Sequence, residues 1–253
     1  MICEEEDSSF SEYMEETFTH RKGIEDRQTA KIENCLKGQT MVSADGRKVL
    51  VEWLAKVQRH LNLSFESFFL AVALVDRFLK TTPISSDCLQ LTGITALLVS
   101  SKMEDIYPPL IADLIRLSAN AYTRVHVIMM ERYMLSRLRF DIATSTPLFF
   151  FDWYSAKMRT VSVSNEKIAK SRALARFILE KAIADYDLSQ LRASHLALAT
   201  LKLVNDAFLI PAFGITSMCE TDTLKTIIRL EIVMKENLKE TPLDKVYSIY
   251  SLD

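Results

Sequence analysis

Residues 89–105 read LQLTGITALLVSSKMED, and this stretch decides the fold. Its first thirteen positions, 89–101, carry no charge and hold small residues (Gly93, Ala96, Ser100, Ser101) among the large apolar ones. A helix that is apolar nearly all round is usually buried, and small side chains let its neighbours approach closely. The stretch therefore predicts the central helix of a helical bundle.

Amphipathic segments flank this central helix on both sides. In RKVLVEWLAKVQRHL, for example, Leu50, Leu54 and Val57 fall on one helical face. Ser64 and Thr123 stand at the starts of two further segments, where an N-cap residue is expected. Together with a central helix at 85–102, the pattern predicts four neighbouring helices, at 47–61, 64–80, 108–118 and 122–138.

The same order of helix types begins again after residue 143. The third helix of this second set, LRASHLALATLKLV, again carries small residues, and its start at Leu191 lies 102 positions after Leu89. The repetition predicts two similar five-helix units in tandem. The second set is predicted at 147–158, 164–185, 187–207, 211–219 and 220–238. The expected division is an N-terminal arm with a short helix (1–45), a first unit (46–143), and a second unit with a C-terminal helix (144–253).

Composition supports an all-α protein and argues against several functions. Only 5 Gly and 6 Pro occur in 253 residues, against an average of roughly 12% for the two together. The net charge of −2 gives no basic field for nucleic acid. The longest apolar stretch is shorter than the roughly 20 residues of a membrane span. The four cysteines and four histidines are scattered, so we expect reduced thiols and neither a metal nor a cofactor.

Two charged pairs interrupt the apolar patterns. Glu131 follows Ile128 at helical spacing on an apolar stripe, and Lys102 ends the central helix. A buried carboxylate needs a partner, and Lys102 is the obvious candidate. The pair is either a structural pin between two helices or a polar spot within an apolar surface that receives another protein. Arg47 and Asp76 favour an ordinary salt bridge between helices.

Six stretches in register resemble the first repeat of the cyclin family: RKVLVEWL, LAVALVDRFL, LQLTGITALLVSSKMED, YPP, YTRVHVIMME and LRFDI. The segment ALARFILEKAIADYDLSQLRASHLALATLKLV is similar to the second repeat of A- and B-type cyclins. The resemblance extends from about Phe10 to Leu252 and favours a mitotic, B or B3-like subtype. It implies two tandem five-helix cyclin-box domains preceded by an N-terminal helix.

The resemblance also implies a partner, a cyclin-dependent Ser/Thr protein kinase that the chain binds as a heterodimer and activates. In the family, the Lys and Glu that match Lys102 and Glu131 contact the C-helix of the kinase and the loop before it. Arg47 and Asp76 match the internal salt bridge of the cyclin box. The implied kinase-binding residues are Val99, Lys102, Met103, Glu104, Asp105, Glu131, Leu135, Phe140 and Ile142.

A second surface of the family, which docks substrates or inhibitors, is matched only in part. Leu50, Trp53 and Gln90 correspond to that patch, but Gly46 replaces its methionine. Lys56 stands where an acid often receives the basic residue of a substrate. We therefore expect substrate docking to be weak or altered.

The sequence thus predicts a non-catalytic regulatory subunit acting in cell-cycle control, present in the nucleus and the cytoplasm, with neither nucleic acid nor membrane as a partner. One alternative is a cyclin-fold scaffold or transcription-related protein, although a basic surface or a zinc ribbon is absent from the sequence. Another is an enzyme built on Glu104, Asp105 and His126, which lack any accompanying nucleophile motif, glycine-rich loop or metal cluster.

Overall fold

The structure, a computed structural model, describes residues 2–32, 34–157, 164–208, 221–241 and 243–250. Every regular element in these ranges is a helix, which confirms the all-α class. The predicted helix at 211–219 lies outside the described residues. The elements are α1 (Ile2–Ile32), α2 (Ala44–His60), α3 (Phe65–Thr81), the 3₁₀ turn η1 (Ser86–Cys88), α4 (Leu89–Glu104), α5 (Ile111–Leu117), α6 (Arg124–Arg137), α7 (Pro147–Lys157), α8 (Asn165–Ala184), α9 (Tyr186–Ser189), α10 (Ala193–Phe208), α12 (Thr221–Glu240) and α13 (Leu243–Tyr250).

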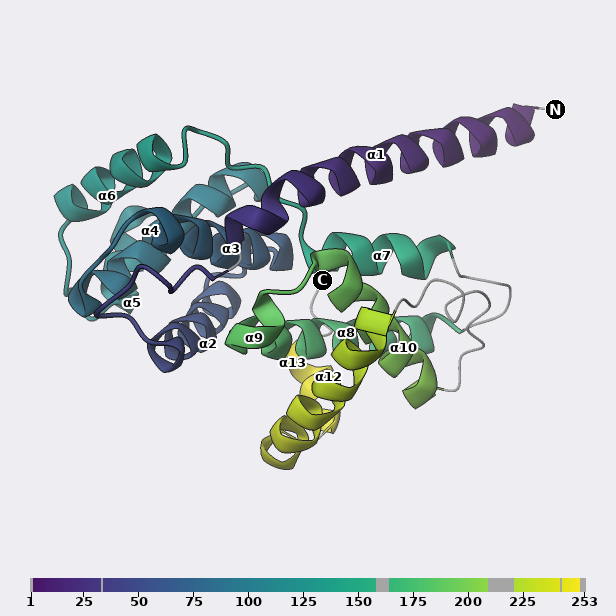
Figure 1. Ribbon diagram of the computed structural model, residues 1–253. Coiled ribbons are helices and arrows are strands. Elements are labelled where there is room, and N and C mark those ends of the chain that lie inside the picture. Colours follow the sequence, from purple (N-terminus) through teal and green to yellow (C-terminus); the bar gives the residue numbers. More distant parts are fainter. Residues whose placement is uncertain (1, 33, 158–163, 209–220, 242, 251–253) are drawn as a thin grey trace.

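Helix α4 is the centre of a first bundle, formed by α2 to α6 (Figure 1). It packs against α2, α3 and α6, and Gln90 is its only residue before Lys102 that is not buried. Gly93 has a packing role, because a Cβ at this position would lie 2.7 Å from Leu50 Cδ1 on α2. The small residues therefore bring α2 close to α4, as the sequence predicted.

Substitution of Gly93 by valine is expected to lower the free energy of unfolding by about 2 kcal/mol, because overpacking a well-packed core costs 1–3 kcal/mol. Chemical denaturation followed by circular dichroism measures the change. Gly38 provides the control, since a Cβ there would meet nothing within 4 Å. Equal stability of Gly93→Val and Gly38→Val would contradict the close-packing argument.

A second bundle follows, in which α10 packs against α7, α8 and α12. The helix predicted at 187–207 is interrupted in the structure, where α9 ends at Ser189 and α10 begins at Ala193. The N-terminal end of α10 at this break is capped by a residue from a distant segment. Glu25 of α1 accepts hydrogen bonds from Ser194 N at 2.7 Å and from Ser194 Oγ at 2.9 Å. A carboxylate at a helix N-terminus satisfies an otherwise unpaired backbone amide.

Helix α1 is longer than the short helix predicted for the arm, and it lies above both bundles (Figure 1). Arg21 Nη1 donates to Thr144 O at 3.1 Å, at the connection between the bundles. The Phe18 ring stacks on Trp153 of α7 with 4.0 Å between centroids. Together with Glu25, these contacts join α1 to the second bundle, while α1 also packs on α3 of the first.

The predicted N-caps Ser64 and Thr123 are present: Ser64 accepts from Ser67 N, and Thr123 accepts from His126 N. Thr146 caps α7 in the same way, accepting from Phe149 N. Thr146 also donates its hydroxyl to Glu66 of α3, which links the two bundles. Burial, together with Glu104 and Asp152 nearby, raises the pKa of Glu66 to about 7, although Thr146 and Arg21 oppose the shift.

The raised pKa of Glu66 makes a pH-dependent prediction. The folded protein holds this proton more tightly than the unfolded chain, so stability falls as pH rises from 4.5 to about 7. Glu66→Gln is therefore expected to raise the free energy of unfolding by roughly 2 kcal/mol near pH 8, and by little near pH 5. Urea denaturation across this range measures the difference. The exposed Glu166→Gln is the control, and a gain independent of pH would refute the assignment.

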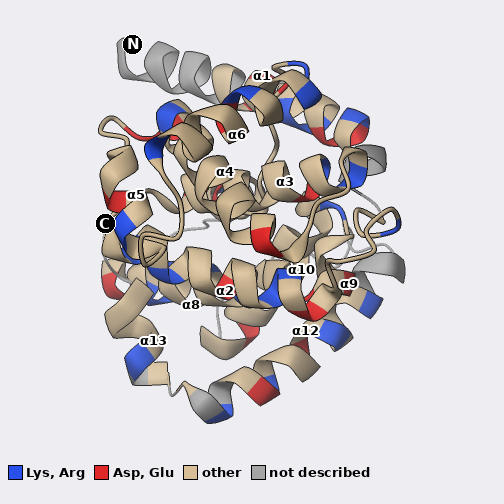
Figure 2. Cartoon of the chain, turned by 90° about the vertical axis from the view of Figure 1, so that its left-hand side faces the viewer, with Lys and Arg blue, Asp and Glu red and all other residues tan. Residues whose placement is uncertain are grey.

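The surface of the first bundle carries interspersed charges of both signs (Figure 2). Within the described ranges, no helix is both long and apolar enough to cross a membrane.

Candidate protein-docking site

Lys102 and Glu131 form the ion pair expected from their positions. Lys102 Nζ, at the C-terminal end of α4, lies 2.5 Å from Glu131 Oε1 of α6. The lysine side chain is 46% exposed and the glutamate 16%, so water reaches one side of the pair. An ion pair of this exposure contributes less than about 1 kcal/mol to folding. Its geometry is thus compatible with a role on the surface as well as with joining two helices.

The core-facing side of α6 differs slightly from the predicted stripe. Val127 and Met134 are its buried residues, whereas Ile128 and Leu135 are half-buried. Glu131 lies four residues after Val127 and three before Met134, hence on the edge of the face that packs on α4. This position explains why its carboxylate reaches Lys102.

The apolar residues predicted for this face are exposed to different degrees. Met103 and Phe140 are exposed, and Leu135 and Ile142 are half-buried. Val99 is buried, so it supports α4 from inside and presents little surface to a partner. Exposed apolar groups around a placed ion pair are typical of protein interfaces.

Phe140 is displayed by a strained turn. Arg139 and Phe140 both have left-handed backbones, with φ of 55° and 56°, and Phe140 N donates to Leu135 O at 2.9 Å to close α6. A bulky residue at positive φ is uncommon and costs energy. The aromatic ring of Phe140 is nevertheless 72% exposed, so burial of the ring does not repay this cost.

Asp105 has a structural task that the sequence did not indicate. Its carboxylate accepts from Ser64 N at 2.8 Å and from Ser67 Oγ at 2.6 Å, so it supports the N-terminus of α3. Glu104, by contrast, is exposed. Of the two acids predicted to contact a kinase, Glu104 is thus the one whose side chain is more available.

The loop after α4 adds three exposed apolar residues that sequence reasoning missed: Ile106, Tyr107 and Leu110, which are 88%, 87% and 70% exposed. Ile106 and Tyr107 also line a groove of about 980 Å³ that reaches Ser248 and Ile249 near the end of α13. In the sequence, these residues are visible only as apolar positions around the double proline, and that pattern does not distinguish a buried residue from an exposed one.

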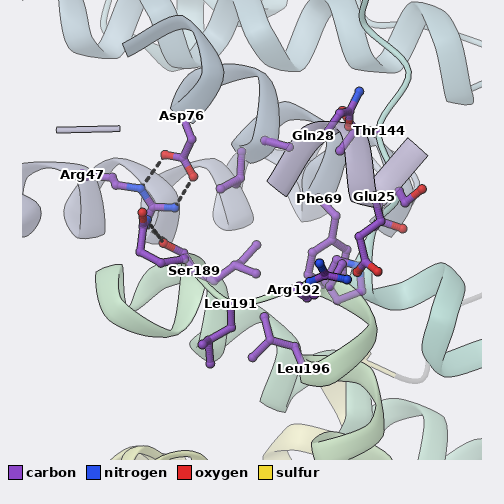
Figure 3. A pocket seen from close by; sticks show the side chains of 18 residues that line it. Glu25, Gln28, Arg47, Phe69, Asp76, Thr144, Ser189, Leu191, Arg192 and Leu196 are labelled. Carbon is purple, nitrogen blue, oxygen red and sulfur yellow. Dashed lines mark hydrogen bonds and ion pairs between the residues drawn. The ribbon is translucent and has the colours of Figure 1, made fainter. Parts of the chain in front are cut away.

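Arg47 and Asp76 form a buried two-pronged salt bridge, as predicted. Arg47 Nε lies 2.6 Å from Asp76 Oδ1, and Nη2 lies 2.7 Å from Oδ2. The third nitrogen, Nη1, donates to Ile183 O of α8 at 2.9 Å, which ties the pair to the second bundle. The pair lies at one end of a cavity of about 80 Å³, with Glu25 and Gln28 of α1 at the other (Figure 3).

Burial and charge act in opposite directions on this salt bridge. Burial by itself lowers the pKa of Arg47, but the Asp76 carboxylate outweighs it, so that the pKa lies above its ordinary value. Burial, followed by the charge of Asp76, raises the pKa of the neighbouring Cys35 thiol to about 12. Arg47 therefore stays charged and Cys35 stays protonated at neutral pH.

The residues of the predicted substrate patch are only partly accessible. Leu50 is buried against Gly93, and Trp53 and Gln90 are half-buried. At Gly46, an added Cβ would make ordinary contacts, the nearest at 3.5 Å from Ser43 Oγ. A larger side chain can therefore be accommodated there, and weak docking stays a prediction.

Two of the three residues of the enzyme alternative, Asp105 and His126, act as helix caps. His126 Nδ1 accepts from Thr123 N at the start of α6, while Asp105 serves α3. Both side chains therefore already have structural hydrogen-bond partners.

The comparisons with known proteins agree with the fold. The model of the cyclin N-terminal domain matches residues 16–143. Cyclin-O protein B of Xenopus laevis is 36% identical over 201 residues, covering 78% of this chain and 54% of that protein. The G2/mitotic-specific cyclin-B of Spisula solidissima is 30% identical over 245 residues, covering 94% and 55%. The chain thus spans about half the length of the curated relatives it matches.

A solved structure shows the same architecture. The X-ray structure of a viral cyclin from herpesvirus saimiri superposes with a TM-score of 0.74 at 19% identity, covering 85% of this chain and 96% of that one. A chain in the structure of the CAK complex of Chaetomium thermophilum, bound to ATP-gamma-S, gives a TM-score of 0.58 at 18% identity, covering 91% and 82%.

Proposed function

This chain belongs to the cyclin family, and from that membership we propose that it is a non-catalytic regulatory subunit that binds and activates a cyclin-dependent Ser/Thr protein kinase. The observation that carries the proposal is the half-exposed Lys102–Glu131 pair, with Met103 and Phe140 exposed beside it.

The docking face of the proposal consists of residues from the end of α4, from α6 and from the turn that follows α6. Lys102, Met103 and Glu104 supply its charged and apolar edge, and Leu135, Phe140 and Ile142 its apolar part. The left-handed backbone at Phe140 supports the proposal, because it presents an aromatic ring to solvent at a cost in backbone energy. Ile106, Tyr107 and Leu110, in the loop that follows α4, add further exposed apolar surface to the first bundle.

The mechanism is a shift between states of the kinase. A docking surface that binds the active position of the kinase C-helix more tightly than the inactive one favours the active state by that difference in affinity. The kinase then supplies the catalytic groups, and this chain supplies binding energy.

Co-elution on gel filtration with a panel of cyclin-dependent kinases, followed by a histone kinase assay, tests the proposal. A stoichiometric complex with raised kinase activity is expected. If every kinase elutes separately, the proposal fails, and the cyclin fold then serves a scaffold or transcription-related role.

A mitotic role and residence in the nucleus and cytoplasm are part of the proposal. Similarity to a G2/mitotic-specific cyclin-B over 94% of the chain supports the mitotic role, and the similarity to Cyclin-O is comparable. The level of the protein in synchronised cells, with imaging of its position, tests both; a level that does not rise before division would contradict the mitotic role.

A further inference from the structure

A line of exposed apolar residues runs along the outer side of α6, and we call it the outer stripe. It consists of Val125, Met129 and Tyr133, which are 60%, 63% and 48% exposed. Residues four apart on a helix lie one above the other, so these side chains form one continuous strip. Helix α6 itself lies at the outer edge of the first bundle (Figure 1).

The outer stripe is separate from the proposed kinase-docking face. Two residues along a helix turn by about 200°, so Glu131 lies on nearly the opposite side of α6 from Met129. Val127 and Met134, which are buried in the bundle, also lie on that opposite side. A partner on the outer stripe can therefore bind while the Lys102–Glu131 pair is covered.

One member of the stripe is held in place from inside the bundle. The Tyr133 ring meets the fully buried ring of Phe78 edge to face, with 5.7 Å between centroids. An aromatic side chain fixed in this way loses little conformational freedom on binding, which favours an anchoring role.

The charges on α6 itself and in the turns at its two ends are mostly positive. Between residues 122 and 140 the cations are Arg124, Arg132, Arg137 and Arg139, and the one acid is Glu131. Glu131 is already bound to Lys102. In the part of the chain that the structure describes, Arg124, Arg132 and Arg139 have no carboxylate partner, although the whole chain carries a net charge of −2.

We propose that the outer stripe binds an acidic amphipathic helix of a third protein. Apolar side chains at spacings of three or four on that helix would cover Val125, Met129 and Tyr133, as in other helix-recognition surfaces. The carboxylates of that helix would face Arg132 and Arg139. These two positive charges would favour an acidic helix over a basic one. The chain would then connect a kinase with a further protein.

A synthetic peptide tests the proposal with the full chain. The probe is a helical peptide of about 15 residues with leucines at spacings of three and four and glutamates elsewhere, labelled for fluorescence anisotropy. The control peptide has lysine in place of every glutamate. The chain variants are Val125→Glu/Met129→Glu and, as a matched control, Ile228→Glu/Ile232→Glu, which alters another exposed pair four residues apart on α12.

We expect the acidic peptide to bind the wild type and to bind at least about tenfold more weakly to Val125→Glu/Met129→Glu and to Arg132→Glu. Binding to Ile228→Glu/Ile232→Glu, and the kinase complex of every variant, should be unchanged. The proposal is overturned if the acidic peptide does not bind, if both peptides bind equally, or if the α12 variant loses as much affinity. It is also overturned if a kinase displaces the peptide, or if sedimentation shows a wild-type dimer that the α6 variant separates, which would make a second copy the occupant.

Discussion

Arg47→Ala is expected to lower the free energy of unfolding by about 4 kcal/mol, the largest loss from any single substitution considered for this chain. The substitution leaves the Asp76 carboxylate buried without its cation and removes the hydrogen bond to Ile183 O, which joins the two bundles. For a chain of this length the loss corresponds to a fall of about 10 °C in Tm. Urea denaturation followed by circular dichroism measures it.

Two further variants show whether the charge or the packing is responsible. Replacing both partners by apolar residues, in Arg47→Met/Asp76→Leu, should recover most of the stability, because no unpaired charge remains. Lys102→Ala removes one partner of the exposed pair and should cost less than about 1 kcal/mol. If Arg47→Ala cost no more than Lys102→Ala, the buried pair would not be a main support of the fold.

Lys102→Glu and Glu131→Lys are each expected to weaken kinase binding by about a hundredfold or more, while leaving the fold intact. Each change places two like charges beside one another in the docking face and reverses one of the charges that the kinase would contact. Surface plasmon resonance with the purified kinase measures the affinity, and thermal unfolding shows that each variant is folded.

The double variant Lys102→Glu/Glu131→Lys separates the two interpretations of this pair. It restores an ion pair between α4 and α6 but exchanges the charges presented outward. If the pair only fixes the helices, the double variant should bind the kinase like the wild type. We expect it to stay impaired, because a docking partner recognises the position of each charge; full recovery would refute direct contact.

Much of the fold could be predicted because its signals are local. The lack of charge in residues 89–101 predicted the buried centre α4, and Ser64 and Thr123 marked the starts of α3 and α6. The break between α9 and α10 could not be predicted, because its capping carboxylate, Glu25, lies 169 residues away in the sequence. The length of α1 was underestimated for a similar reason, since its support comes from α3, α7 and α10.

The candidate site was predictable where a residue conflicts with its surroundings. Glu131 on an apolar helix face and Lys102 at a helix end indicated the pair that the structure contains. Ile106 and Tyr107 gave no such signal, because an apolar residue in a loop is consistent with burial until its neighbours in space are known. The cap role of Asp105 depends on Ser64 and Ser67, about 40 positions earlier, and was equally invisible.

The position of α1 has a consequence for how the chain folds while the ribosome is synthesising it. Helix α1 is synthesised before the groups it binds, since Thr144, Trp153 and Ser194 follow their partners in α1 by 123 to 169 residues. At a synthesis rate of 5–20 residues per second, Glu25 waits roughly 10 to 30 s for Ser194 to appear. During that interval the nascent α1 lacks its contacts with the second bundle, so its docking there can be completed only after the start of α10 has been synthesised.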